Sequence, residues 1–213
     1  MRWIPTLALI AIVSLCGGPR PALAQDEAPS PSDPEIKLAA EVSVRTWLAL
    51  GTSGYALAKD SPIGRDGFEK VLAPLGPDVV RRLVADFVWA IHGETKHKQR
   101  TNERAFVTVF RSRTPEAAQE LVRQLTLVGK RQDEEMRKAG VLVGVEYSEV
   151  RPPGASAAVA SVREIKTEVR TIKAAKIVFA VGPLTYEVAL FDGGKPELKS
   201  LTDAILHQVR TLF

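Results

Sequence analysis

Histidine is the first residue type to consider for chemistry, because the chain contains only three. His92, Glu94 and His97 stand close together in the segment IHGETKHK. Two imidazoles and one carboxylate form the ligand set of some catalytic zinc sites. On a regular strand, however, His92 and Glu94 share one face and His97 lies on the other, so a turn would have to bring the three together. One hypothesis is therefore a metal-assisted hydrolase, and the favoured alternative is a solvated hairpin.

The same segment is basic. Lys96, Lys98, Arg100 and Arg104 fall within nine positions. Such a strip suits an anionic partner, for example a lipid headgroup, a cell-wall polymer or the acidic face of another protein. Lysine and arginine also protect exposed sheet edges from aggregation, and from sequence alone we favour this simpler explanation. Nucleic acid is not expected as a ligand, because no aromatic residues alternate with these cations.

Other catalytic patterns are missing from the sequence. It contains no GxSxG motif and no glycine-rich phosphate loop before a helix. The run Asp133-Glu134-Glu135 lies in a strongly helical segment, where consecutive side chains point in different directions, and we expect these carboxylates to face mainly solvent. The sequence therefore predicts no catalytic residue, no cofactor and a protein that is not an enzyme.

Two aromatic residues flank a glycine-containing loop. Trp47 precedes residues 51–54 and Tyr55 follows them. Aromatic side chains at such a loop could line the mouth of a ligand pocket, although packing in the core is the more common role.

Residues 1–24 have the pattern of a cleaved secretory signal peptide. Arg2 supplies a positive start, an apolar run covers Ile4 to Cys16, and Ala22-Leu23-Ala24 precedes Gln25 as a small-x-small cleavage site. The apolar run is shorter than the roughly 20 residues of a membrane-spanning helix. We expect an exported protein, periplasmic or extracellular, without a transmembrane segment in its mature chain.

Cys16 is the only cysteine. A lipid anchor at this residue is an alternative, although Leu15 is larger than the residue that usually precedes a lipidated cysteine. Once the signal is removed, the mature chain has no cysteine, which excludes disulfides, thiolate metal sites and cysteine nucleophiles.

Composition indicates an ordinary folded domain. The chain has 213 residues, of which 45% are hydrophobic and 25% charged. Removal of Arg2 and Arg20 with the signal leaves the basic residues only slightly in excess of the acidic ones. Residues 25–34 are rich in proline and serine and are expected to form a linker. Residues 35–213 are predicted to form one domain.

The first part of this domain, residues 35–83, is predicted to be helical. Asp33-Pro34-Glu35 is a typical helix start, although the apolar residues that follow stand at even positions, as in a strand. Residues 51–83 are punctuated by glycine and proline. They contain two short helical segments, Asp66 to Leu72 and Asp78 to Val84.

Residues 84–213 are predicted to form a sheet–helix core. The alternation of side chains indicates strands, and helical spacing indicates a long helix over 115–139 and a closing helix after Gly194. The strand segments are 87–91, 106–110, 141–147, 158–171, 176–181 and 184–191. The fold class is therefore α+β, an antiparallel sheet of about five to six strands with two amphipathic helices on one face, preceded by short helices.

The order of these elements, and the helix start RTPEAAQELV after a strand, are similar in topology to known extracytoplasmic domains. Over residues 84–213 the chain resembles small sandwiches of the PsbP/Mog1 type and the sensor-like ectodomains of some bacterial receptor kinases. The resemblance implies a fold and carries no functional residue with it.

Three functions follow as hypotheses. The first is an exported binding or sensor-like module without enzymatic activity, whose partner is an unknown protein or an anionic component of the envelope. Its binding surface would be the sheet face left free by the helices or the basic hairpin. The second is the metal-assisted hydrolase, and the third is a structural subunit of an envelope complex.

Overall fold

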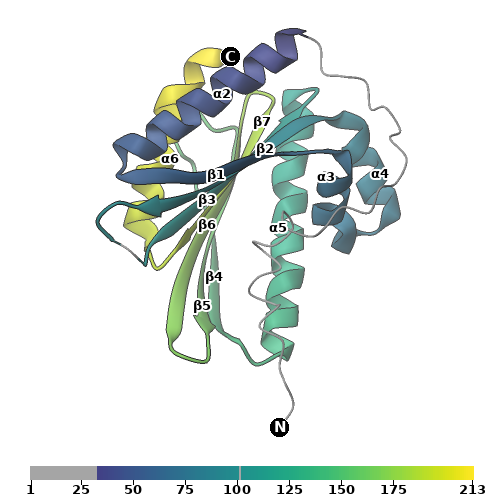
Figure 1. Cartoon of the computed structure of the whole chain (residues 1–213). Helices are drawn as coiled ribbons and strands as arrows, with labels where there is room; N and C mark the ends of the chain where they lie inside the picture. The colour runs from purple at the N-terminus through teal and green to yellow at the C-terminus, as the bar shows by residue number, and fades with distance from the viewer. Residues whose placement is uncertain (1–32, 101) are drawn as a thin grey trace, which may run out of the picture. The chain divides into compact units, whose positions relative to one another are not determined.

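A seven-stranded antiparallel sheet forms the centre of the computed structural model, which describes residues 33–100 and 102–213 (Figure 1). The strand order is β1-β2-β3-β7-β6-β5-β4, and each neighbouring pair is antiparallel. The strands are β1 (Tyr55–Ile63), β2 (Phe87–His97), β3 (Arg104–Ser112), β4 (Leu142–Glu149), β5 (Ala157–Lys166), β6 (Thr171–Val181) and β7 (Leu184–Phe191). The predicted α+β class is confirmed.

Helices cover both faces of this sheet (Figure 1). They are α2 (Asp33–Thr52), α3 (Arg65–Leu72), α4 (Pro77–Asp86), α5 (Pro115–Lys138) and α6 (Lys195–Val209), with short 3₁₀ turns at η1 (Ala73–Leu75) and η2 (Arg210–Leu212). Helices α2 and α6 pack on one face, and α3, α4 and α5 pack on the other.

The prediction that the two long amphipathic helices share one face was therefore wrong. The reason lies in the strands, because β6 is apolar on both of its sides. Phe179 packs in the core under α2 and α6, and its neighbour Val178 packs in the core under α5. A strand that is almost continuously apolar needs cover on both faces.

The sheet has seven strands, whereas about five to six were predicted. The strand that was not predicted is β1, which lies at one edge of the sheet and pairs with β2. It falls within residues 51–83, where only loops and short helices were expected. The predicted strand over 158–171 also ends earlier, because residues 167–170 form a turn in which Thr167 and Arg170 bond to each other. Helix α2 begins at Asp33, so the last two residues of the predicted linker are helical.

The even spacing in α2 reflects two apolar stripes on one helix. Val42 and Leu50 are buried against the sheet, whereas Ile36, Val44 and Leu48 are more than half exposed. Residues four apart in a helix share a face, so two such stripes offset by two residues produce an alternation in the sequence.

Side chains from the first turn and from the second half of α2 fix this helix in place. Glu35 accepts hydrogen bonds from Trp89 Nε1 (3.1 Å) and from Arg111 (3.2 Å), which are register partners on β2 and β3. Arg45 donates to the backbone oxygen of Gln208 (3.0 Å) and so ties α2 to the end of the chain.

The signal-peptide and Cys16 predictions concern residues 1–32, which lie outside the described residues. Within 33–100 and 102–213, no helix combines the length and apolarity that a membrane-spanning segment needs.

Candidate functional site

The three candidate metal ligands are not brought together. His92 and Glu94 lie on the α5 side of β2, whereas His97 lies on the α2 side beside Tyr55, with ring centroids 5.1 Å apart. The Nδ1 atom of His97 accepts hydrogen bonds from the backbone N–H groups of Gln99 (3.1 Å) and Arg100 (2.9 Å). Across the described parts of the chain, no three or more His, Cys, Asp or Glu side chains are grouped to hold a metal ion. Since β2 remains regular up to His97, the turn that the metal hypothesis required is not formed.

Trp47 and Tyr55 belong to the packed interior rather than to an open pocket mouth. Tyr55 is in the core, and its hydroxyl donates to Glu103, a buried carboxylate that also pairs with Arg100 (3.0 Å). Burial, followed by the hydrogen bond to Glu103, raises the pKa of Tyr55. The ring of Trp47 fills the space beside Gly93, where a Cβ atom would lie 2.1 Å from it. This contact explains the glycine within β2.

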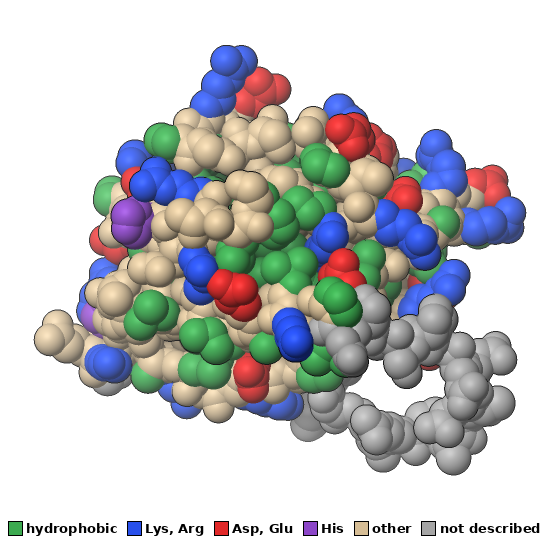
Figure 2. Space-filling view, turned by 90° about the horizontal axis from the view of Figure 1, so that it is seen from above, with side chains coloured by type: hydrophobic (Ala, Val, Ile, Leu, Met, Phe, Trp, Pro, Cys, Tyr) green, Lys and Arg blue, Asp and Glu red, His purple; other side chains and the backbone are tan. Residues whose placement is uncertain are grey.

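The basic strip lies at the end of two interior strands. Strand β1 pairs with β2 as far as Tyr55 opposite His97, and β7 pairs with β3 as far as Phe191 opposite Arg104. The favoured explanation from sequence, protection of a sheet edge, was therefore wrong, because neither β2 nor β3 is an edge strand. Another cause must account for the cations at this end of the molecule, which projects to the left in Figure 1. In Figure 2, Lys and Arg side chains are scattered over the face seen from above, with acidic side chains among them.

The four cations of the strip differ in their surroundings. Arg100 pairs with Glu103 and with Glu197 (3.7 Å), and Arg104 lies 3.5 Å from Glu94. Lys96 and Lys98 are exposed, and their side chains have no ion-pair or hydrogen-bond partner among the residues that the structure describes. These two lysines are therefore free to meet an anionic partner.

The α5 side of the sheet divides into two halves. In the covered half, helices α3, α4 and α5 pack on the strands, and Phe110, Val178 and Ala180 are at most 3% exposed. The other half belongs to neither apolar core, and its side chains range from buried, at Phe106 and Thr108, to half exposed, at Arg104. We call this half the open face, and its residues are His92, Glu94, Arg104, Phe106, Thr108, Lys176, Glu187 and Phe191.

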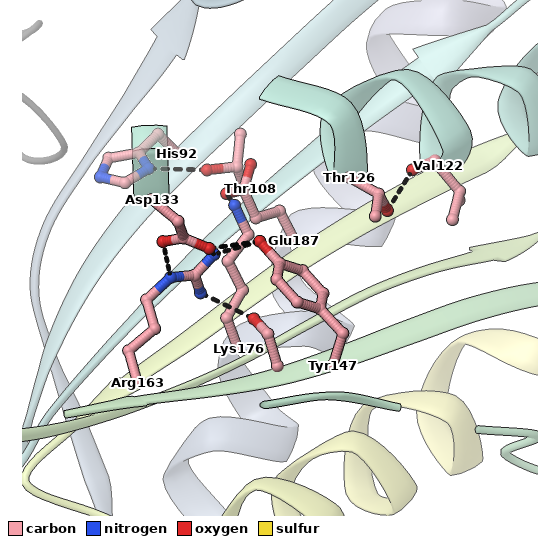
Figure 3. A network of polar contacts seen from close by, with 10 residues as sticks. His92, Thr108, Val122, Thr126, Asp133, Tyr147, Arg163, Lys176 and Glu187 are labelled. Carbon is pink, nitrogen blue, oxygen red and sulfur yellow. Dashed lines mark hydrogen bonds and ion pairs between the residues drawn. The ribbon is translucent and has the colours of Figure 1, made fainter. Parts of the chain in front are cut away.

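Polar contacts link the strands of the open face (Figure 3). His92 Nδ1 and Thr108 Oγ1 are 2.9 Å apart, and Lys176 forms an ion pair with Glu187. The side chains of this ion pair are only 18% and 21% exposed. The desolvation of two partly buried charges offsets much of their attraction, so this pair contributes little to stability and its place in the middle of a sheet fits a further role.

The environment of His92 favours the neutral imidazole. Burial lowers the pKa of His92, while the negative charges of Glu187 and Glu94 oppose this effect and Lys59 adds to it. Because a neutral imidazole has one donor and one acceptor nitrogen, His92 can bond to Thr108 and still offer its second nitrogen to a ligand.

A second network joins α5 to β4 and β5, next to the open face. Arg163 forms a two-pronged contact with Asp133, at 2.5 Å and 3.0 Å, and also donates to Ser161 (2.7 Å) and Tyr147 (3.1 Å). The Tyr147 hydroxyl donates to Asp133 as well. The expectation that Asp133 faces solvent was wrong, because its partner Arg163 holds it in the interior at 2% exposure.

Gly129 of α5 makes room for this network. A Cβ atom at Gly129 would lie 3.3 Å from the Arg163 guanidinium and 3.6 Å from the Tyr147 hydroxyl. The small pocket beside it, between α5 and the sheet, has room for about one water molecule. This network therefore holds α5 on the sheet and offers no space for a larger ligand.

Sequence reasoning missed most of the open face. Lys176 and Glu187 are charged residues within otherwise apolar strands, and this pattern was a usable signal. Phe106 and Phe191 had no such signal, because an aromatic residue in a strand is most often in the core.

Comparisons with known proteins point only to the fold. No family model matches the chain, and no curated protein matches it. Among solved structures, the chain is similar to the crystal structure of the extracellular domain of PknH from Mycobacterium tuberculosis, with a TM-score of 0.51 and 9% sequence identity. The match covers 83% of this chain and 96% of that domain. The likeness therefore extends beyond residues 84–213, to which the topological resemblance was first assigned.

Proposed function

We propose that the protein is an exported, non-enzymatic binding module of the sensor-like kind, and that it binds an anionic partner of the cell envelope at the open face and the adjoining hairpin. The observation that carries the proposal is the position of Lys96 and Lys98. They stand at the ends of interior strands, without partners in the described chain, next to a sheet face that no helix core covers.

The charges on the open face support an anionic partner. Each acid on this face already lies near a cation, Glu94 near Arg104 and Glu187 near Lys176. The two lysines of the hairpin therefore give this end an uncompensated positive charge, which attracts anions and speeds their encounter.

Two further observations agree with an extracytoplasmic binding role. The first 24 residues have the pattern of a secretory signal. The fold is similar to that of a domain described as extracellular. On the described residues, the carboxylates and imidazoles that an active site would need are already paired or lie on opposite faces, which favours binding over catalysis.

The test is co-sedimentation of the purified protein with envelopes isolated from the cells that produce it. Lys96→Glu/Lys98→Glu should lower the bound fraction at least tenfold, and the wild-type interaction should weaken as salt is added. The matched control is Lys37→Glu/Lys138→Glu, which makes the same change of charge at exposed positions on α2 and α5. Equal loss in both double variants, or no loss in either, would refute a binding site at the hairpin.

Arg100 must be left unchanged in this experiment. Its guanidinium lies 3.0 Å from the buried Glu103, so reversal of its charge would remove the partner of this carboxylate and place a second carboxylate beside it. A loss of binding in such a variant would report unfolding of the hairpin rather than loss of a contact.

A further inference from the structure

The open face contains an aromatic centre that the charge argument leaves unexplained. Phe106 and Phe191 are in contact across β3 and β7, with ring centroids 5.4 Å apart and planes at 86°. The imidazole of His92 is stacked on Phe106 at 6.2 Å. None of these three rings belongs to the two apolar cores, although Phe106 is only 9% exposed.

Polar side chains surround these rings on two sides. Glu94 and Arg104 lie beside Phe106 on the hairpin side, and Lys176 and Glu187 lie on the side towards β6. Each pair places an acceptor next to a donor. The Glu94–Arg104 contact is long, at 3.5 Å, and Arg104 is half exposed, so its guanidinium can turn to an incoming ligand at little cost.

From this arrangement we infer that the ligand of the open face is an acidic glycan, whose sugar ring packs on the partly exposed Phe191, which the buried ring of Phe106 supports, and whose acidic groups meet Lys96, Lys98 and Arg104. This inference rests on the proposed function and specifies its ligand.

The chemistry of the site matches such a ligand in three respects. The C–H groups of a sugar ring pack well on an aromatic face, whose electron density attracts their positive ends. Neighbouring hydroxyl groups of a sugar both donate and accept hydrogen bonds, as the Glu94–Arg104 and Lys176–Glu187 pairs do. The excess of positive charge at the hairpin selects the glycans that carry acidic groups.

The chemistry also distinguishes this ligand from a purely anionic one. A simple polyanion, such as an acidic peptide, would need the lysines but not the rings. The aromatic requirement is therefore the specific prediction of this inference.

Calorimetric titration of the purified protein with three probes tests it. The probes are oligogalacturonate, which has both rings and carboxylates, poly-γ-glutamate, which has carboxylates without rings, and maltohexaose, which has rings without charge. The wild-type protein should bind oligogalacturonate at least tenfold more tightly than either of the others.

The variant Phe191→Ala should weaken oligogalacturonate binding about tenfold, because one ring contact of this kind is worth up to about that factor. The matched control is Phe213→Ala, which removes a half-exposed ring away from the open face and should leave binding unchanged. Circular dichroism of both variants shows whether each is folded, and Phe191→Leu serves in place of Phe191→Ala should the latter unfold.

The outcomes separate this inference from the proposed function. If oligogalacturonate does not bind, or if poly-γ-glutamate binds as tightly and Phe191→Ala changes nothing, the glycan inference is wrong. In that case, loss of envelope binding in Lys96→Glu/Lys98→Glu would still support the proposed function as a binding module. Only when the envelope experiment also fails is the proposed function refuted.

Discussion

The two halves of the α5 side of the sheet are made by the same strands but have opposite characters. On β3, Phe110 packs under the helices, and Thr108 and Phe106, two and four residues away on the same side of the strand, do not. On β6, Val178 belongs to the core and Lys176 forms an ion pair. The difference shows that the same strands carry an apolar half, which packs under the helices, and a second half of charged and aromatic side chains outside both apolar cores.

The largest effect is expected in the covered half. Phe110 is 1% exposed and lies against Phe68. Phe110→Ala should lower the free energy of unfolding by about 3–5 kcal/mol, because it leaves a cavity between the sheet and its helices. Phe191→Ala, in the open half, should cost less than half as much. Urea denaturation measures both, and equal losses would show that the two halves are not energetically distinct.

The next largest loss of stability is expected on disruption of the buried ion pair between Asp133 and Arg163 under α5. Asp133→Ala leaves the Arg163 guanidinium without its partner in the interior and should cost about 3 kcal/mol. The double variant Asp133→Leu/Arg163→Met removes both charges and should recover much of this loss. A single variant as stable as the wild type in urea would mean that α5 does not depend on this pair.

A polar pair in the open half should behave differently. Lys176→Met/Glu187→Leu replaces a partly buried ion pair by apolar side chains, so the protein should keep its stability to within about 1 kcal/mol or gain some. Binding to isolated envelopes should nevertheless fall, because the donor and acceptor of the open face are gone. Unchanged binding together with a large loss of stability would show that the pair serves the fold rather than a ligand.

The smallest effect concerns pH. Because burial lowers the pKa of His92, the unfolded chain takes up a proton at a higher pH than the folded protein does. Stability should therefore fall as the pH drops below about 6.5, the ordinary histidine value, until His92 is protonated in the folded state as well. His92→Gln lacks this contribution, so it should lose less stability than the wild type between about pH 7.5 and about pH 5.5. If urea denaturation showed the same loss of stability in the wild type and in His92→Gln over this pH range, the lowered pKa of His92 would be contradicted.

The sequence was most informative where structure is determined locally. The start of α5 at Thr114-Pro115-Glu116 and the break between the strands predicted over 176–181 and 184–191 follow from local residues, and both are present. Strand β1 was missed because an edge strand with a proline has a weak alternation signal.

The contacts on the open face and in the network beside it join residues that are far apart in the sequence. Asp133 resembles a solvated helix residue until Arg163, thirty positions later, lies beside it. Lys96 and Lys98 resembled edge protection, because the sequence does not show that β1 covers β2. The candidate site is defined by which strands pair with each other and by where the covering helices end. Both are set by tertiary packing rather than by local sequence.

The most direct test of the binding face is amide chemical-shift mapping of the isotope-labelled protein during titration with oligosaccharides released from its own envelope. The shifts are predicted to cluster in β2, β3 and β7 around Glu94, Phe106 and Phe191, and to disappear in Lys96→Glu/Lys98→Glu. Shifts confined to α2 or to the covered half, or none at saturating concentrations of the extract, would contradict the assignment of the open face as the site of binding.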